Sequence, residues 1–86
     1  MRKIVIDGNY MKSKEEMHDH LKQEFDLPYY YARNLDSFYQ ILLKEEDPIE
    51  VVLENKESIA LGYGDALILL LKDLASKNSN YVLEIK

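Results

Sequence analysis

Three short apolar segments, separated by stretches with helical spacing, constrain the fold of this chain most strongly. Residues 4–6, 49–53 and 81–85 are rich in β-branched or aromatic side chains, which predicts three strands. Strands separated by helical segments pair in parallel by default, and right-handed crossovers in one direction place every helix on a single face. The sequence therefore predicts an α/β fold, a three-stranded parallel sheet covered by about four helices in the order β-α-α-β-α-α-β.

Capping residues that precede apolar stripes predict the first two helices. Ser13 and Glu16 form an S-x-x-E capping box, and the helix that follows is expected to end before Leu27-Pro28. Asn34 is a favourable N-cap for the second helix, which the segment 45–48 ends. The buried stripes expected of these helices are Met17, Leu21 and Phe25 in the first and Leu35, Phe38, Ile41 and Leu42 in the second.

The second half of the chain is predicted to hold a short helix and a long one. Asn55 or Ser58 is expected to cap the short helix, which runs to about Leu61, where Gly62 offers a left-handed residue. Apolar residues at i, i+3, i+4 and i+7 predict the long helix, and they are Leu67, Leu70, Leu71 and Leu74.

Length and charge limit what a chain with this fold can do. Eighty-six residues are enough for one domain, 1–86, and too few for two. The absence of cysteine excludes a disulfide scaffold, and no segment resembles a signal peptide or spans a bilayer, so we expect a cytoplasmic protein without membrane contact. The net charge of −5 argues against direct nucleic-acid binding. Ten acids against four bases lie in residues 26–73, a surface that either attracts a basic partner or only keeps the protein soluble.

The sequence offers no complete set of catalytic or metal-binding residues. The three glycines form neither a dinucleotide fingerprint nor a phosphate loop. His18 and His20 point to nearly opposite sides of a helix and cannot share a metal. Glu16, His20 and Glu24 share one stripe, but solvated polar stripes are far commoner than metal sites. We therefore expect no enzyme activity, no metal and no cofactor.

Tyrosines are concentrated just before and within the second helix. Four of the seven lie between residues 29 and 39, and tyrosine is favoured where a ring packs while its hydroxyl stays in water. The side of the second helix opposite its apolar stripe is expected to display Asp36, Tyr39, Gln40 and Leu43. An aromatic and an aliphatic residue beside a carboxylate indicate a binding surface, although packing at a domain edge explains tyrosines as well.

Residues 27–38, Leu-Pro-Tyr-Tyr-Tyr-Ala-Arg-Asn-Leu-Asp-Ser-Phe, resemble the L-P-x-Y-Y-G-x-N-L-D-A signature of the barstar family. The resemblance extends to the order of elements and to the length. It implies an intracellular inhibitor of a secreted ribonuclease of the barnase type. In that family the second helix and the loop before it block the ribonuclease active site, and acidic side chains take the place of substrate phosphates.

The resemblance also implies which residues bind the partner. Tyr30 corresponds to a contacting tyrosine of the family, Asp36 to its first acid on the second helix, and Asp73 to an acid on the last helix. Tyr39 stands where the family has a tryptophan, and Gln40 where it has its most important aspartate. Three other positions depart from the family, with Ala32 in place of the signature glycine and Lys44-Glu45 in place of a glycine-tryptophan pair.

The predicted function is that of a cytoplasmic immunity protein, a monomer when free, that blocks a basic ribonuclease or related toxin by substrate mimicry. Its partner-binding residues are predicted to be Tyr30, Asn34, Asp36, Tyr39, Gln40, Leu43 and Asp73. The loss of charge at Gln40 leaves two further interpretations. In the first, the chain is an inhibitor whose target differs from barnase or is bound through other contacts. In the second, it is an interaction module of the same fold whose partner is not a ribonuclease.

Overall fold

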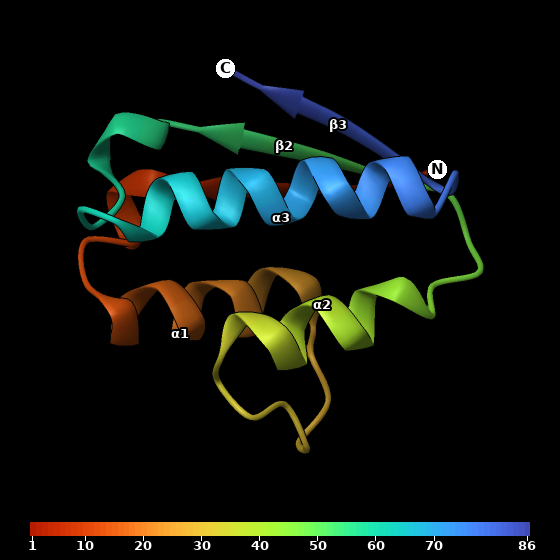
Figure 1. Ribbon diagram of the computed structural model, residues 1–86, viewed down its shortest axis with the longest axis horizontal. Helices are drawn as coiled ribbons and strands as arrows, with labels where there is room; N and C mark the ends of the chain where they lie inside the picture. The colour runs from red at the N-terminus through yellow and green to blue at the C-terminus, as the bar shows by residue number, and fades with distance from the viewer.

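The computed structural model describes residues 1–86 and contains one three-stranded parallel sheet (Figure 1). The strands are β1 (Arg2–Asp7), β2 (Ile49–Glu54) and β3 (Tyr81–Ile85), in the order β1-β2-β3. In the register Ile4 pairs with Val51, and Val51 pairs with Leu83. The predicted α/β class and parallel pairing are confirmed.

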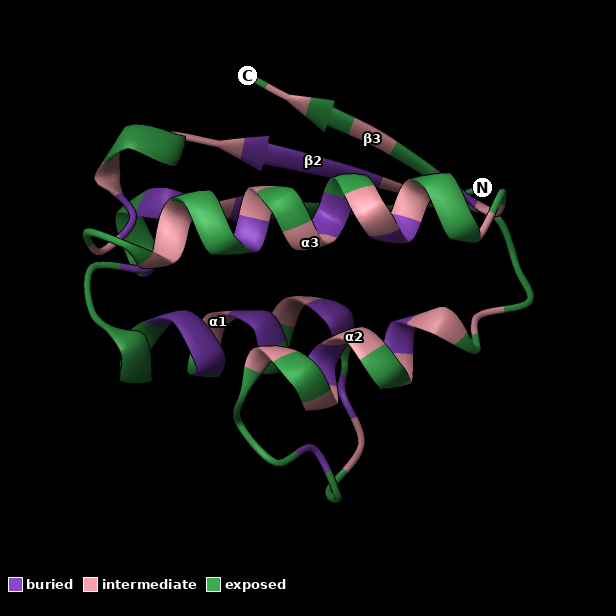
Figure 2. Ribbon diagram, in the orientation of Figure 1, coloured by how far each residue is buried: buried purple, intermediate pink, exposed green.

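The chain has three α-helices: α1 (Lys14–Phe25), α2 (Leu35–Leu43) and α3 (Tyr63–Lys77). α1 packs against β1 and α3 against β3, while α2 packs mainly against α3. In Figure 1, α3 passes in front of the sheet, while α1 and α2 lie below α3. Ile4, Val51 and other inward-facing strand residues are buried, whereas residues such as Val5 and Val82 are exposed. In Figure 2, β2 is buried over most of its length, and exposed and intermediate residues alternate along β3. Alternation along the edge strands therefore leaves one face of the sheet open.

The short helix predicted after Asn55 or Ser58 and up to about Leu61 is shorter than expected and is of the 3-10 type, so the chain has three α-helices where about four helices were predicted. The segment after β2 forms only a 3-10 turn, Lys56–Ser58, and a second such turn, Gly8–Tyr10, follows β1. Asn55 has a left-handed backbone (φ 53°) and gives no side-chain cap, and Ile59 is already extended. None of the three turn residues is buried, so no packing compensates the cost of starting a helix. Gly62 is left-handed (φ 87°), as predicted, and directly precedes α3.

The predicted helix starts are confirmed by their side-chain caps. Ser13 Oγ accepts a hydrogen bond from the Glu16 amide (3.1 Å) at the start of α1. Asn34 Oδ1 accepts one from the Ser37 amide (2.7 Å) at the start of α2. Each cap satisfies a backbone donor that has no partner within the helix.

The core lies between the sheet and the helices. Phe25 of α1 and Phe38 of α2 meet edge to face, with ring centroids 5.1 Å apart. The stripe predicted for α1 is buried throughout. In the other two helices the predicted residues Leu35, Ile41 and Leu70 are only partly buried. Leu35 and Leu70 line an open groove between α2 and α3, whereas Ile41 lines a separate hollow beside Phe25 and Tyr81. No helix is long and apolar enough to cross a bilayer.

Candidate functional site

The loop between α1 and α2 presents two tyrosines to solvent. The side chains of Tyr29 and Tyr30 are 93% and 64% exposed, and their rings meet edge to face at 5.5 Å. The loop is the lowest part of the molecule in Figure 1, where it projects away from the helices. Large rings that stay in water on a projecting loop are suited to packing against another molecule.

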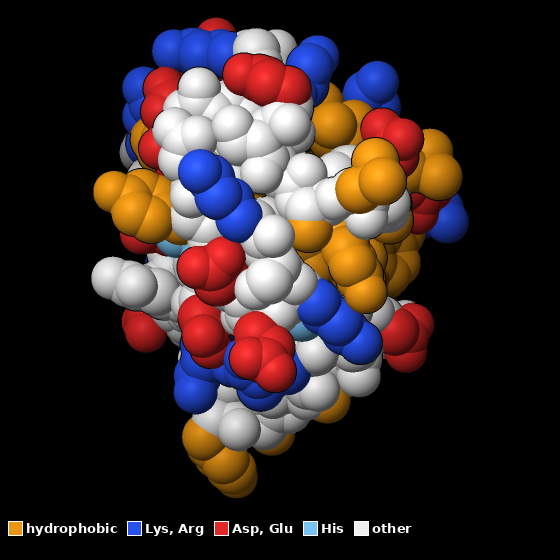
Figure 3. Space-filling view, turned by 90° about the vertical axis from the view of Figure 1, so that its left-hand side faces the viewer, with side chains coloured by type: hydrophobic (Ala, Val, Ile, Leu, Met, Phe, Trp, Pro, Cys, Tyr) orange, Lys and Arg blue, Asp and Glu red, His pale blue; other side chains and the backbone are white.

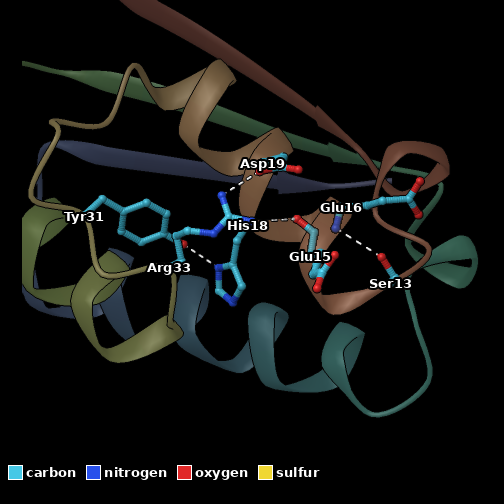
Figure 4. Close-up of polar contacts among 7 residues, drawn as sticks. All are labelled: Ser13, Glu15, Glu16, His18, Asp19, Tyr31 and Arg33. Carbon is cyan, nitrogen blue, oxygen red and sulfur yellow. Dashed lines mark hydrogen bonds and ion pairs between the residues drawn. The ribbon is translucent and has the colours of Figure 1, made fainter.

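The base of this loop is fastened to α1. Tyr31 is buried, and its hydroxyl shares a hydrogen bond with Nδ1 of the buried His18 (Figure 4). Arg33 pairs with the Asp19 carboxylate at 2.6 Å and donates to the Glu15 carbonyl oxygen at 3.4 Å. These contacts span 13 to 18 residues of sequence, so they fix the loop relative to the helix.

Burial sets the ionisation of the two buried groups. It raises the pKa of Tyr31 to about 12, so the hydroxyl stays protonated. It also lowers the pKa of His18, and the nearby positive charges of Arg33 and Lys14 lower it further. His18 is therefore a neutral ring bound to a neutral phenol.

The loop has a left-handed backbone conformation at Arg33 and not at Ala32, the position where the family signature has a glycine. Arg33 has a positive φ of 57°, whereas Ala32 does not. The Ala32 amide donates to Ser37 Oγ at 3.0 Å, and the Tyr31 amide donates to the Pro28 carbonyl at 3.0 Å. An alanine therefore fits this loop without strain at its own position.

A second feature lies between α2 and α3, where Tyr39 meets Asp73. The Tyr39 hydroxyl donates to Asp73 Oδ2, and Lys77 Nζ lies 3.3 Å from the same oxygen. The hydrogen bond from Tyr39 is the main cause that lowers the pKa of Asp73, and Lys77 adds to it. The same bond raises the pKa of Tyr39. Asp73 is thus a carboxylate whose orientation is fixed by an aromatic residue of the neighbouring helix.

Tyr39 and Asp73 line an open groove of about 630 Å³ between α2 and α3. Its lining comes from both helices and consists of Leu35, Asp36, Tyr39, Ala66, Leu69, Leu70 and Asp73. Asp36 is exposed in the first turn of α2, where the positive end of the helix favours an acid, and it forms no ion pair. The groove therefore combines an apolar surface with two carboxylates, one from each wall.

The predicted binding residues are divided among three places. Asp36, Tyr39 and Asp73 meet in the groove, while Tyr30 and Asn34 lie on the loop, where Asn34 uses its side-chain oxygen as a cap. Gln40 is exposed, as predicted. Leu43 lies at the far end of α2, and its carbonyl accepts a hydrogen bond from Asn78 Nδ2 at 3.2 Å.

The prediction that Tyr39 and Leu43 are displayed to solvent was wrong. Both are half-buried and pack against the core. A helical stripe identifies one buried side, but α2 packs against α3 as well as against the rest of the core, so its apolar arc is wider. The groove residues Leu35, Ala66, Leu69 and Leu70 were not predicted as part of a site. The spacing of Ala66, Leu69 and Leu70 at i, i+3 and i+4 was the signal available in the sequence.

The stripe of Glu16, His20 and Glu24 does not form a metal site. His20 Nε2 accepts a hydrogen bond from the Asp7 amide at 3.0 Å, so its lone pair is already used. No group of three or more histidine, aspartate or glutamate side chains is arranged to hold a metal ion. His20 instead connects α1 to the end of β1.

The fold, a parallel sheet with three helices, is that of a small α/β protein. Its α1–α2 loop and the acidic groove between α2 and α3 form a surface suited to binding. Comparison with known families matches residues 1–82 to the family model described as "Barstar (barnase inhibitor)". The chain belongs to the barstar family. The resemblance noted in residues 27–38 is thereby confirmed.

A protein of Bacillus subtilis (strain 168) is similar to more than half of the chain. It is named "Putative ribonuclease inhibitor YrdF", and it is 47% identical over 58 residues. The matched segment is 66% of this chain and 64% of the Bacillus protein, so the match spans less than two thirds of either length.

Proposed function

We propose that this protein inhibits a basic ribonuclease by covering its active site with the α1–α2 loop and the groove between α2 and α3. The observation that carries the proposal is the pair of carboxylates, Asp36 and Asp73, that line one groove. The family description and the name of the Bacillus relative, each of which refers to ribonuclease inhibition, support it. The acidic balance of residues 26–73 would steer a basic enzyme toward this side of the chain.

Substrate mimicry is the mechanism that these groups support. A ribonuclease holds RNA phosphates with cationic side chains, and a carboxylate on a fixed surface forms charge-assisted hydrogen bonds with the same groups. Asp36 is free of internal ion pairs and is available for this contact. Asp73 is fixed in orientation by Tyr39, so it loses little freedom when a partner binds.

The loop supplies the aromatic part of the contact. Tyr30 is exposed beside Tyr29, and the contacts of Tyr31 and Arg33 with α1 hold the base of the loop against this helix before binding. Gln40, exposed one turn after Asp36, would contribute specificity rather than charge. In a cell that makes the ribonuclease, this protein would act as its cytoplasmic immunity protein.

The first experiment measures RNA cleavage by barnase, and by the basic ribonucleases of the source organism, with and without the purified protein. Wild-type protein should suppress cleavage by at least one of these enzymes and should not cleave RNA alone. Asp36→Asn keeps the shape of the side chain and removes its charge, so binding should weaken by at least about 2 kcal/mol, the scale for losing one partner of a buried charge pair. Asp47→Asn, an exposed acid outside the groove, is the matched control and should change binding by less than about 0.5 kcal/mol.

A second variant tests the departure from the family at Gln40. Gln40→Asp should increase affinity for barnase, because it restores an acid at the position where the family has one. The gain is limited by repulsion from Asp36 four residues earlier on the same helix. If wild-type protein and Gln40→Asp both leave every tested ribonuclease active, the ribonuclease proposal is wrong, and a partner of another class is indicated.

A further inference from the structure

The helix α3 carries more apolar surface than the core uses. Leu67, Leu71 and Leu74 are buried against the rest of the protein. Leu69, on a neighbouring stripe, is 71% exposed, and Ala66 one turn earlier is exposed as well. Because solvent covers most of the Leu69 side chain, its contribution to folding is small.

Leu69 belongs to a continuous apolar surface. It lines the groove together with Leu35 and Leu70, which are only partly buried. In Figure 3 the largest cluster of hydrophobic side chains lies at the right of the view, among acidic and basic side chains, and smaller groups lie at the left edge and at the bottom. A scattered exposed leucine is ordinary, but one that lines a groove with other apolar side chains marks an interaction surface.

The charges on the groove indicate what kind of molecule covers it. Asp36 on α2 and Asp73 on α3 both line the groove, and the only cation paired with either of them is Lys77. A partner seated there must bring cations to Asp36. A second copy of this chain, docked by the same surface, would bring carboxylates against carboxylates. The charges therefore favour a basic protein over self-association.

We propose that Leu69 is a specificity-determining contact, over which the ribonuclease inserts an apolar side chain, aliphatic or aromatic, that projects from its basic surface. This inference rests on the proposed function and extends its contact surface from the acids to the middle of α3. On an α-helix Leu69 and Asp73 are separated by about 6 Å along the axis, so one partner segment reaches both. The apolar contact supplies affinity that does not depend on charge, on a surface where Gln40 replaces an acid of the family.

The test compares the same substitution at two exposed leucines of the chain. Leu69→Gln should weaken binding to the inhibited ribonuclease by about tenfold or more, the effect expected of a central interface residue. Leu61→Gln is the matched control, because Leu61 is fully exposed and lies outside the groove, and its affinity should stay within about twofold of wild type. Leu69→Met, which keeps an apolar side chain of similar size, should retain most of the affinity. Thermal unfolding of all three variants should match wild type.

Salt dependence separates the apolar contact from the acidic one. The loss caused by Leu69→Gln should be the same at about 0.05 M and 0.5 M salt, whereas the loss caused by Asp36→Asn should shrink as salt screens the charges. If Leu69→Gln stays within about twofold of wild type while Asp36→Asn is impaired, this inference is wrong and the proposed function stands. If no ribonuclease is inhibited at all, both are wrong. A wild-type dimer in sedimentation experiments that Leu69→Gln dissociates would also overturn the inference, since a second copy would then occupy the groove.

Discussion

Removing the hydroxyl of Tyr31 should destabilise the protein by an amount set by one buried hydrogen bond. Tyr31 and His18 are 6% and 3% exposed, and the Tyr31 hydroxyl is the hydrogen-bond partner of Nδ1 of His18. Tyr31→Phe preserves the packing of the ring but leaves this nitrogen buried without a partner. A buried polar group that loses its partner costs about 1–3 kcal/mol.

Equilibrium unfolding in urea measures this cost directly. The urea dependence of unfolding for a domain of this size is about 1 kcal/mol per molar, so the midpoint should fall by roughly 1–3 M. The melting temperature should fall by about 4–8 °C for each kcal/mol lost. Tyr29→Phe is the matched control in the same loop, because Tyr29 is 93% exposed, and its stability should stay within about 0.5 kcal/mol of wild type.

A double-mutant cycle identifies the hydrogen bond as the cause. His18→Leu removes the other partner, so adding Tyr31→Phe to it should cost clearly less than Tyr31→Phe costs in wild type. The coupling energy should be at least about 1 kcal/mol. A coupling near zero, or a loss of less than about 0.3 kcal/mol for Tyr31→Phe alone, would show that this contact does not fasten the loop.

Two further predictions follow from buried positions. The pKa of His18 is lowered in the folded protein, so below the ordinary histidine pKa of about 6.5 this side chain binds a proton more readily in the unfolded chain than in the folded one. The contribution of His18 to stability should therefore be fully present above pH 6.5 and decrease as the pH falls toward the folded-state pKa. Urea midpoints of the His18→Leu variant should decrease less over the same pH range. Equal pH dependence in wild type and variant would contradict this role of His18. Gly8→Ala should destabilise by at least about 2 kcal/mol, because a Cβ there would lie 1.9 Å from the Asn55 carbonyl oxygen. Gly64→Ala, whose nearest contact would be 3.3 Å from Ile59, should cost far less, and equal melting temperatures for the two variants would refute the argument.

The parallel sheet and its three major helices were predictable because their signals are local and repeated. The segments around Ile4, Val51 and Leu83 are β-rich, and the caps at Ser13 and Asn34 mark helix starts that the structure confirms. The same reasoning failed after β2, where a favourable cap residue precedes only a 3-10 turn. A cap lowers the cost of starting a helix, but burial of an apolar face decides whether a short helix persists.

The sequence by itself also determined the family, because residues 27–38 carry a continuous signature. The groove, by contrast, was decided only by tertiary structure. Tyr39 and Asp73 are 34 residues apart and share a hydrogen bond, and Asp36 and Leu69 line one groove from different helices. Helical periodicity tells which side of one helix is apolar, but it carries no information about how far a second helix covers that side. Whether Tyr39 is a free ring or a support for Asp73, and whether Leu69 is core or surface, depends on how closely α2 and α3 pack.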